Sequence, residues 1–420
     1  MATTFKTFLN NDVTTTKTLL HEAIPITGAI VSGTYDQGQV NAPSVQTEYN
    51  IKNYSHGMFQ SVYDYPYLSS SANHIFDIAV GYSTGSNLSG NISSATPALN
   101  YKQQKKKIAM YNQMAQVLMG HDKNGSIQRF DRDGNLSDDN AGKMDEVVFL
   151  NFSRLLVKDE IKKGSFQIKF GTQPIFKSGK GLQGYAPSDI HHLLTIKDTN
   201  AQNDFRINSP AGEYGILSAS HTTPAGRQGI RHGLGSKETV SSNVGLIFYQ
   251  AGVVVLTASI FAGSGKSGDG TAIGGGGLLN QAVSMSIGGA HAGATGTKHG
   301  VAGTVSASID QMLTGSRIQD IANNIRRRTH DISFNNTTEL NSTVYFCRAN
   351  HNEFNYSANP SYLQSSKIRV KDVPSDMPIS YVTSIGLYSP DNELMATAKL
   401  SEPLRKDPTN ELTLRVRLDY

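Results

Sequence analysis

The chain has 420 residues, and its 38 Lys and Arg residues against 34 Asp and Glu residues give a formal net charge of +4. This length suits two or three domains of roughly 100 to 200 residues each, and the small net charge gives no general reason to expect nucleic acid or an anionic membrane as a partner. Only 17% of the residues are charged, against about 25% in an ordinary soluble domain. Much of the surface is therefore neutral and polar, which suits β-rich subunits that pack against neighbours, because a buried unpaired charge is costly.

The single cysteine, Cys347, excludes an intramolecular disulfide framework and a zinc site made of several thiolates. Residues 1–20 lack the uninterrupted apolar stretch of a signal peptide. The longest apolar run, residues 253–263, is about half the roughly 20 residues that a membrane helix needs. We therefore expect a soluble, unsecreted protein that is made in the cytoplasm.

The first half of the chain contains one clear helix and several strands. In residues 102–119, apolar side chains recur at spacings of three and four and stop at Gly120, which predicts an amphipathic helix. Residues 147–150 and the alternating Phe166, Ile168 and Phe170 predict strands, and a short helix could lie between them at 154–162. Residues 243–261 predict a β-hairpin that turns at Gln250, Ala251 and Gly252.

A third of residues 262–303 are glycine, and few of the others have large apolar side chains. Because this segment can bury too little apolar surface to offset the entropy of ordering it, we expect a long loop that becomes ordered only against a neighbouring subunit. Two short helices follow, the second opened by Ser316 with Gln319 at a capping-box spacing, and with Ile318, Ile321 and Ile325 on one face.

Strand patterns dominate the last 90 residues. Residues 343–347 predict one strand, and a second strand should carry Ile379, Tyr381, Ile385 and Leu387 on one face. A turn at 389–393 leads into a returning strand at 394–399. Leucine and valine alternate strictly with polar residues from Leu412 to Asp419, which predicts an antiparallel sheet with one buried face.

Together these elements predict a mainly β (α+β), multi-domain fold with antiparallel β-domains, a few short helices and long irregular or Gly-rich loops. We expect five parts along the chain: an extended N-terminal segment with short strands (1–100), a mixed α+β body (101–260), a Gly-rich loop (261–304), short helices (305–331) and a C-terminal antiparallel β-domain (332–420).

Two segments resemble ligand-binding motifs without matching them. Residues 263–267 read Gly-Ser-Gly-Lys-Ser after an apolar run, but Ile260 stands where the phosphate loop needs glycine and no helix pattern follows. Residues 131–135 carry the acidic pattern of a calcium loop, but the glycine is misplaced and Gly142 stands where a bidentate glutamate is needed. We expect a solvated turn there, with a weak cation site as the alternative.

Other candidate groups carry no catalytic pattern. The histidines form no HExxH motif, and no nucleophile elbow stands between a strand and a helix. Surface or core positions are expected for His191, His192, His221, His232, His291 and His299. The basic clusters 105–107 and 326–328 lie at helix ends, where we expect them to be solvated, with contacts to an acidic neighbouring subunit as the alternative.

Five phrases carry a resemblance to a known class of proteins. They are MYNQMAQVLMGHDKNGSIQRFDRDGNL (110–136), EVVFLNFSRLLVKDEIKKGSFQIKFG (146–171), ELNSTVYFCRANHNEFNYSANPSYL (339–363), SYVTSIGLYSPDNELMATAKLSEPLRK (380–406) and LTLRVRLDY (412–420). These phrases resemble virion structural proteins of contractile-tailed phages, especially those of marine cyanobacterial myoviruses. The resemblance implies a tail or baseplate subunit in the virion that connects neighbouring subunits through a β-rich body and flexible segments.

The resemblance transfers no functional residue, so no catalytic, cofactor-binding or metal-binding residue is assigned and no enzyme activity is expected. It implies other tail and baseplate subunits as partners, in homo- and hetero-oligomers, without nucleic acid or membrane. A receptor-binding or glycan-binding tail protein is the alternative, because tyrosines such as Tyr63, Tyr65 and Tyr67 can stack on sugars. A neck or head-associated structural protein is the second alternative.

Overall fold

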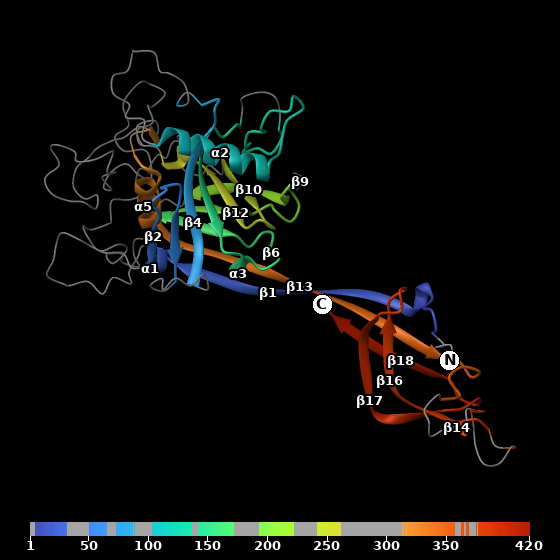
Figure 1. Ribbon diagram of the computed structural model, residues 1–420. Helices are drawn as coiled ribbons and strands as arrows, with labels where there is room; N and C mark the ends of the chain where they lie inside the picture. Colours follow the sequence, from blue (N-terminus) through green and yellow to red (C-terminus); the bar gives the residue numbers. More distant parts are fainter. Residues whose placement is uncertain are drawn as a thin grey trace, which may run out of the picture. The chain divides into compact units, whose positions relative to one another are not determined.

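The computed structural model shows a mainly antiparallel β protein with a few helices (Figure 1), as the sequence predicts. The chain divides into two compact units: a smaller unit of Met1–Leu20 and Glu339–Tyr420, and a larger unit of His21–Thr338. These units cut across the five predicted parts, because β1 and β13 each carry residues of both. The structure describes residues 5–31, 50–64, 73–86, 88, 103–136, 142–171, 193–221, 242–261, 313–314, 316–357, 363–364, 367–368, 375 and 377–420.

The larger unit is built on a continuous antiparallel sheet. Its strands lie in the order β7-β8-β10-β11-β12-β5-β4-β3-β2, and β9 pairs with β10. The strands are β2 (Ile51–Asn53), β3 (Gln60–Tyr63), β4 (His74–Tyr82), β5 (Glu146–Phe152), β6 (Glu160–Ile161), β7 (Gln167–Gly171), β8 (Leu193–Lys197), β9 (Phe205–Ser209), β10 (Gly212–His221), β11 (Ser242–Phe248) and β12 (Val253–Thr257). The helical segments are α1 (Gly28–Val31), α2 (Gln104–Leu118), α3 (Arg154–Val157), η4 (Ala258–Phe261) and α5 (Ile318–Arg328).

Both faces of the central strands are buried. In β5, Val148, Leu150 and Phe152 belong to one hydrophobic cluster, while Val147 and Phe149 belong to a second cluster. Successive side chains of a strand point to opposite faces, so the two clusters lie on the two sides of the sheet. This arrangement explains why the strands read as continuous apolar runs in the sequence.

The predicted helix at 102–119 is confirmed as α2, and Figure 1 shows it lying across one face of the sheet. Its buried residues include Tyr111, Ala115 and Leu118, which join the second cluster. Gly81 of β4 permits this close packing, because a Cβ atom there would lie 2.8 Å from the Lys107 carbonyl oxygen and 2.9 Å from the Tyr111 nitrogen. The helix stops before Gly120, whose φ of +79° suits glycine.

The hairpin predicted at 243–261 is confirmed by β11 and β12, which pair from Gly245 with Leu256 to Phe248 with Val253, but the returning strand ends at Thr257 and residues 258–261 form the 3-10 helix η4. Gly252 in the turn has φ +67°, a left-handed conformation that glycine adopts without strain. The strands predicted at 147–150 and 166–170 are confirmed as β5 and β7. The possible helix at 154–162 is shorter than expected, because α3 ends at Val157 and the chain then pairs as β6 with β13.

The apolar face of α5 is confirmed, since Ile318, Ile321 and Ile325 are all buried. The predicted cap is wrong by one residue. Arg317, not Ser316, is the N-cap, and the Asp320 carboxylate accepts hydrogen bonds from the Arg317 backbone nitrogen (3.3 Å) and guanidinium Nε (3.0 Å).

The smaller unit contains a long ladder and a separate hairpin. β13 (Thr329–Ala349) pairs with β18 (Leu412–Asp419), from Ser342 opposite Asp419 to Ala349 opposite Leu412, so the strand predicted at 343–347 is part of a much longer one. β1 (Val13–Thr27) is the other neighbour of β13. The alternation predicted for 412–418 is confirmed, because its apolar side chains are shielded and its polar side chains are exposed. The remaining elements are η1 (Asn10–Asp12), β14 (Leu363–Gln364), β15 (Lys367–Ile368), β16 (Ser380–Tyr388) and β17 (Leu394–Lys406).

The predicted turn at 389–393 is confirmed: Ser389 N donates to Glu393 O over 2.8 Å, and β16 pairs with β17 on either side of the turn. The prediction of one apolar face for Ile379, Tyr381, Ile385 and Leu387 is wrong. A register shift between Val382 and Ser384 changes which side chains are shielded, so Tyr381 is 54% exposed while Leu387 is buried. A strict period of two in the sequence cannot show such an irregularity.

Candidate functional site

Exposed large apolar side chains are concentrated in the smaller unit. In the described part of the larger unit only Val117, Leu155 and Ile207 are of this kind. Those of the smaller unit are Phe5, Phe8, Leu9, Leu19, Leu20, Leu340, Phe354, Tyr356, Met377, Tyr381, Tyr388, Leu394, Met395 and Tyr420. Scattered exposed apolar residues are ordinary, whereas a contiguous apolar patch is a candidate interaction surface.

The interior of the smaller unit is correspondingly small. Among its described residues, Val344, Leu387 and Val416 are the only buried apolar side chains, whereas the larger unit has two extensive clusters. Burial of apolar area is the main favourable contribution to folding. The smaller unit therefore gains little stability from its own interior, and covering its exposed side chains would add to it.

Three of these side chains form a contiguous patch, which we call the hairpin patch: Phe5, Tyr388 and Leu394. The rings of Phe5 and Tyr388 meet edge to face with centroids 4.9 Å apart. Tyr388 and Leu394 are paired across the hairpin, and both lie over Gly386. Each member of the patch is about half exposed (44%, 47% and 53%), so the patch offers apolar area that is already ordered and not yet covered.

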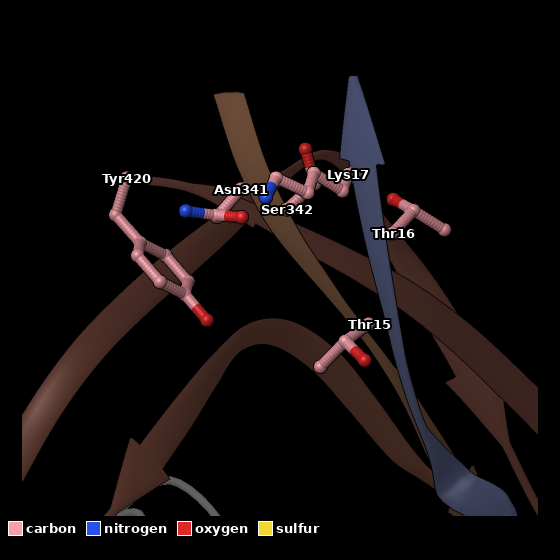
Figure 2. A pocket seen from close by; sticks show the side chains of 6 residues that line it. All are labelled: Thr15, Thr16, Lys17, Asn341, Ser342 and Tyr420. Atoms are coloured by element: carbon pink, nitrogen blue, oxygen red, sulfur yellow. The ribbon is translucent and has the colours of Figure 1, made fainter. Parts of the chain in front are cut away.

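A cavity of about 360 Å³ lies elsewhere in the smaller unit; its lining residues are polar, although carbon atoms form most of the lining surface. Figure 2 shows its lining side chains, which come from β1, from β13 and from the residue after β18. The lining consists of Thr15, Thr16, Lys17, Asn341, Ser342 and Tyr420. The lining combines hydroxyl and amide groups, an aromatic ring and the Lys17 ammonium group, which is paired with Glu339, and these groups suit a small polar ligand.

Hydrogen bonds hold several of these lining groups in place. The Ser342 hydroxyl donates to Asp419 Oδ1 over 2.6 Å, and the Tyr420 hydroxyl lies 2.9 Å from Thr343 Oγ1. Lys17 Nζ lies 2.6 Å from Glu339 Oε2. The Tyr420 ring is fixed by its hydroxyl while the side chain remains 73% exposed, so its face is available for contact.

The turn at residues 131–135 exists and is solvated in part: Asn135 is exposed, but the expectation is wrong for Asp131. Asp131 is fully buried, and its Oδ2 atom lies 2.8 Å from Nζ of Lys143, which is nearly buried as well. Asp131 Oδ1 also accepts a hydrogen bond from the Asp133 nitrogen over 2.9 Å. An ammonium group of the chain thus lies beside the carboxylate. In the described ranges, no group of three or more His, Cys, Asp or Glu side chains is arranged to hold a metal ion.

The expectation of solvated basic clusters is wrong for two residues. Lys107 is buried in α2 and donates to the carbonyl oxygens of Ser316, over 2.6 Å, and of Leu313. Burial lowers the pKa of Lys107 to about 7, although nearby Asp320 opposes the shift. Arg326 is also buried and donates to Val31 O (2.9 Å) and to Gln60 Oε1 (3.2 Å). Both cations therefore join segments of the larger unit, a role that sequence spacing alone does not reveal.

The structure describes only some of the other residues that the sequence suggested as candidates. Tyr63 is buried in β3, and this burial raises its pKa, so it does not present a face for sugar stacking. His221 ends β10. The remaining candidates lie outside the described residues: Tyr65, Tyr67, His191, His192, His232, His291, His299, residues 263–267 and the Gly-rich segment 262–303. In the described ranges no helix has the length and apolar character needed to cross a membrane.

Comparison of the sequence with protein-family models matches no family, comparison with curated proteins matches no protein, and comparison with solved structures matches no structure. The exposed apolar surface of the smaller unit is therefore the feature that bears most directly on function.

Proposed function

We propose that this protein is a non-enzymatic structural subunit of a contractile-tailed phage virion, located in the tail baseplate, and that its smaller unit binds neighbouring subunits. The observation that carries the proposal is the concentration of exposed large apolar side chains in a unit with a small interior of its own. Such a unit gains most of its apolar burial on assembly, as the subunits of obligate complexes do.

Two further observations support the same role. The larger unit is a sheet buried on both faces, which gives the subunit a stiff, close-packed body. The low content of charged residues keeps the desolvation cost of large contacts small. The phrases that resemble phage virion proteins include the β16–β17 hairpin and β18, and the hairpin belongs to the proposed binding unit.

The direct test of this function is quantitative mass spectrometry of purified phage particles separated into heads and detached tails. Recovery of the chain with tails, at a fixed ratio to the sheath protein, is the expected result. Recovery with heads would place the same structural role in the neck or capsid and overturn the baseplate location. Absence from both fractions would overturn the structural role.

A glycan-binding role is a second candidate, and the cavity of the smaller unit is the observation that favours it. The exposed ring of Tyr420 could stack on a sugar while Asn341 and the threonine hydroxyls hydrogen-bond to its hydroxyl groups. A glycan array probed with the full chain and with Tyr420→Ala tests this role. Binding that Tyr420→Ala removes would support it, and failure of the unaltered chain to bind any glycan would exclude it.

A further inference from the structure

The hairpin of the smaller unit has one unprotected edge. β16 reads Ser-Tyr-Val-Thr-Ser-Ile-Gly-Leu-Tyr, without a charged residue or a proline, and in the described part of the chain it pairs with β17 alone. β17 contains Lys399, Glu402 and Pro403, and β18 exposes Arg415 and Arg417. Charges and proline are among the devices by which proteins prevent edge strands from pairing with other chains. β17 and β18 carry these devices and β16 does not.

An isolated two-stranded hairpin is marginally stable in water, and three or more strands are normally needed. The β16–β17 pair forms a sheet of its own, and its strand residues Tyr381, Tyr388, Leu394 and Met395 are 47–69% exposed. A further strand at the β16 edge would satisfy its outer backbone groups and lie beside its exposed tyrosines, Tyr381 and Tyr388. The sequence and the exposure of the hairpin thus point to strand addition at this edge.

We infer that the β16 edge pairs antiparallel with β16 of a second copy of this chain, about a twofold axis at Ser384. This inference rests on the assembly role proposed above and names one partner in it. Ser384 is the middle residue of the nine-residue strand, so this centre gives the longest overlap of the two copies. The resulting sheet would have the order β17-β16-β16-β17, and a twofold contact of this kind closes on itself without forming a fibre.

The absence of charge on β16 favours a second copy as the occupant. A twofold axis places a strand opposite itself, so like charges on the strand would face one another, and β16 has none. The same pairing of β18 would bring arginines together. The contact would be small, because Tyr381 and Tyr388, the two half-exposed large side chains of β16, supply on the order of 200 Å² per copy before the strand backbone is added, against about 800 Å² per partner in a typical stable interface.

Cysteine cross-linking tests the register. In a Cys347→Ser background, Ser384→Cys places two thiols opposite each other across the axis, while Ser401→Cys on exposed β17 is the matched control. Under mild oxidation of the full chain, we expect Ser384→Cys to form covalent dimers roughly tenfold faster than the control, because pairing raises the effective thiol concentration. Equal rates for the two variants would overturn the inference.

Sedimentation of the full chain gives a second and independent readout. We expect a dimer that Ser384→Lys converts to monomer through repulsion at the axis, while Ser401→Lys leaves it dimeric. A wild-type monomer, or a dimer that Ser384→Lys does not disturb, would overturn the inference. Neither result would affect the proposed virion role, because that role is tested separately by recovery of the chain with particles.

Discussion

At the scale of single residues, buried polar groups of the larger unit join segments that lie far apart in the sequence. Lys107 binds the carbonyl oxygens of Leu313 and Ser316, and Arg326 binds that of Val31. These partners are about 200 to 300 positions away in the chain. A basic run at a helix end looks the same in sequence whether it is solvated or buried, so the solvated interpretation failed here for lack of any local signal.

The lowered pKa of Lys107 predicts a pH dependence of stability. The folded chain releases this proton near pH 7, whereas the unfolded chain holds it up to its ordinary pKa of 10.5. Between these values the unfolded state binds more protons, so the free energy of unfolding should rise with pH by a few kcal/mol. Urea unfolding across this range should show the rise in the wild type and a flatter profile in Lys107→Met. Identical slopes for the two proteins would contradict the burial of this ammonium group.

Because Asp131 and Lys143 form a buried ion pair, we expect the stability losses of substitutions at the two positions to be strongly non-additive. Either Asp131→Asn or Lys143→Met alone should destabilise the larger unit by about 3–5 kcal/mol, because one charge is left buried without its partner. The double variant should recover much of this loss. Removing the exposed pair of Arg417 and Asp419 serves as control and should change the unfolding free energy little. The measurement is the unfolding free energy of the three variants in denaturant. A double variant whose loss equals the sum of the two single losses would argue against a buried ion pair.

At the scale of elements, sequence patterns predicted correctly the helices and hairpins whose residues are close together in the chain. The α2 helix and the β11–β12 hairpin follow from side-chain periodicity and from glycines at their ends, and both predictions are confirmed. The β16 face prediction is wrong, because the register shift after Val382 arises from the pairing with β17. The cavity of the smaller unit also could not be predicted, since its lining comes from strands whose pairing spans the whole chain.

The close packing of α2 on β4 predicts a strict size limit at Gly81. A Cβ atom there would meet the backbone of α2 at 2.8–2.9 Å, so Gly81→Ala must displace the helix. We expect a loss of about 1–3 kcal/mol in unfolding free energy. Gly85→Ala is the control, because its nearest neighbour would lie at 3.5 Å, and it should change stability little. Equal losses of unfolding free energy for Gly81→Ala and Gly85→Ala would show that the contact between Gly81 and the α2 backbone does not limit the packing.

At the scale of the whole molecule, the two units differ in how they are stabilised. The larger unit encloses its apolar side chains on both faces of a sheet, while the smaller unit leaves about half of its described large apolar side chains exposed. Neutral composition and strand alternation predicted a β-rich subunit suited to packing against neighbours. The participation of β1 in the ladder with β13 was not predicted, because it joins residues at opposite ends of the chain.

The central claim is that the smaller unit carries the assembly surface, and incorporation of matched variants into particles tests it most directly. Leu394→Glu places a charge in the hairpin patch, and Leu155→Glu places one at a similarly exposed site of the larger unit (53% and 62% exposed). With equal expression of both, we expect at least about a tenfold loss of Leu394→Glu from purified particles, since a buried unpaired charge costs about 1.4 kcal/mol or more. We expect near wild-type incorporation of Leu155→Glu. Full incorporation of Leu394→Glu would contradict the claim.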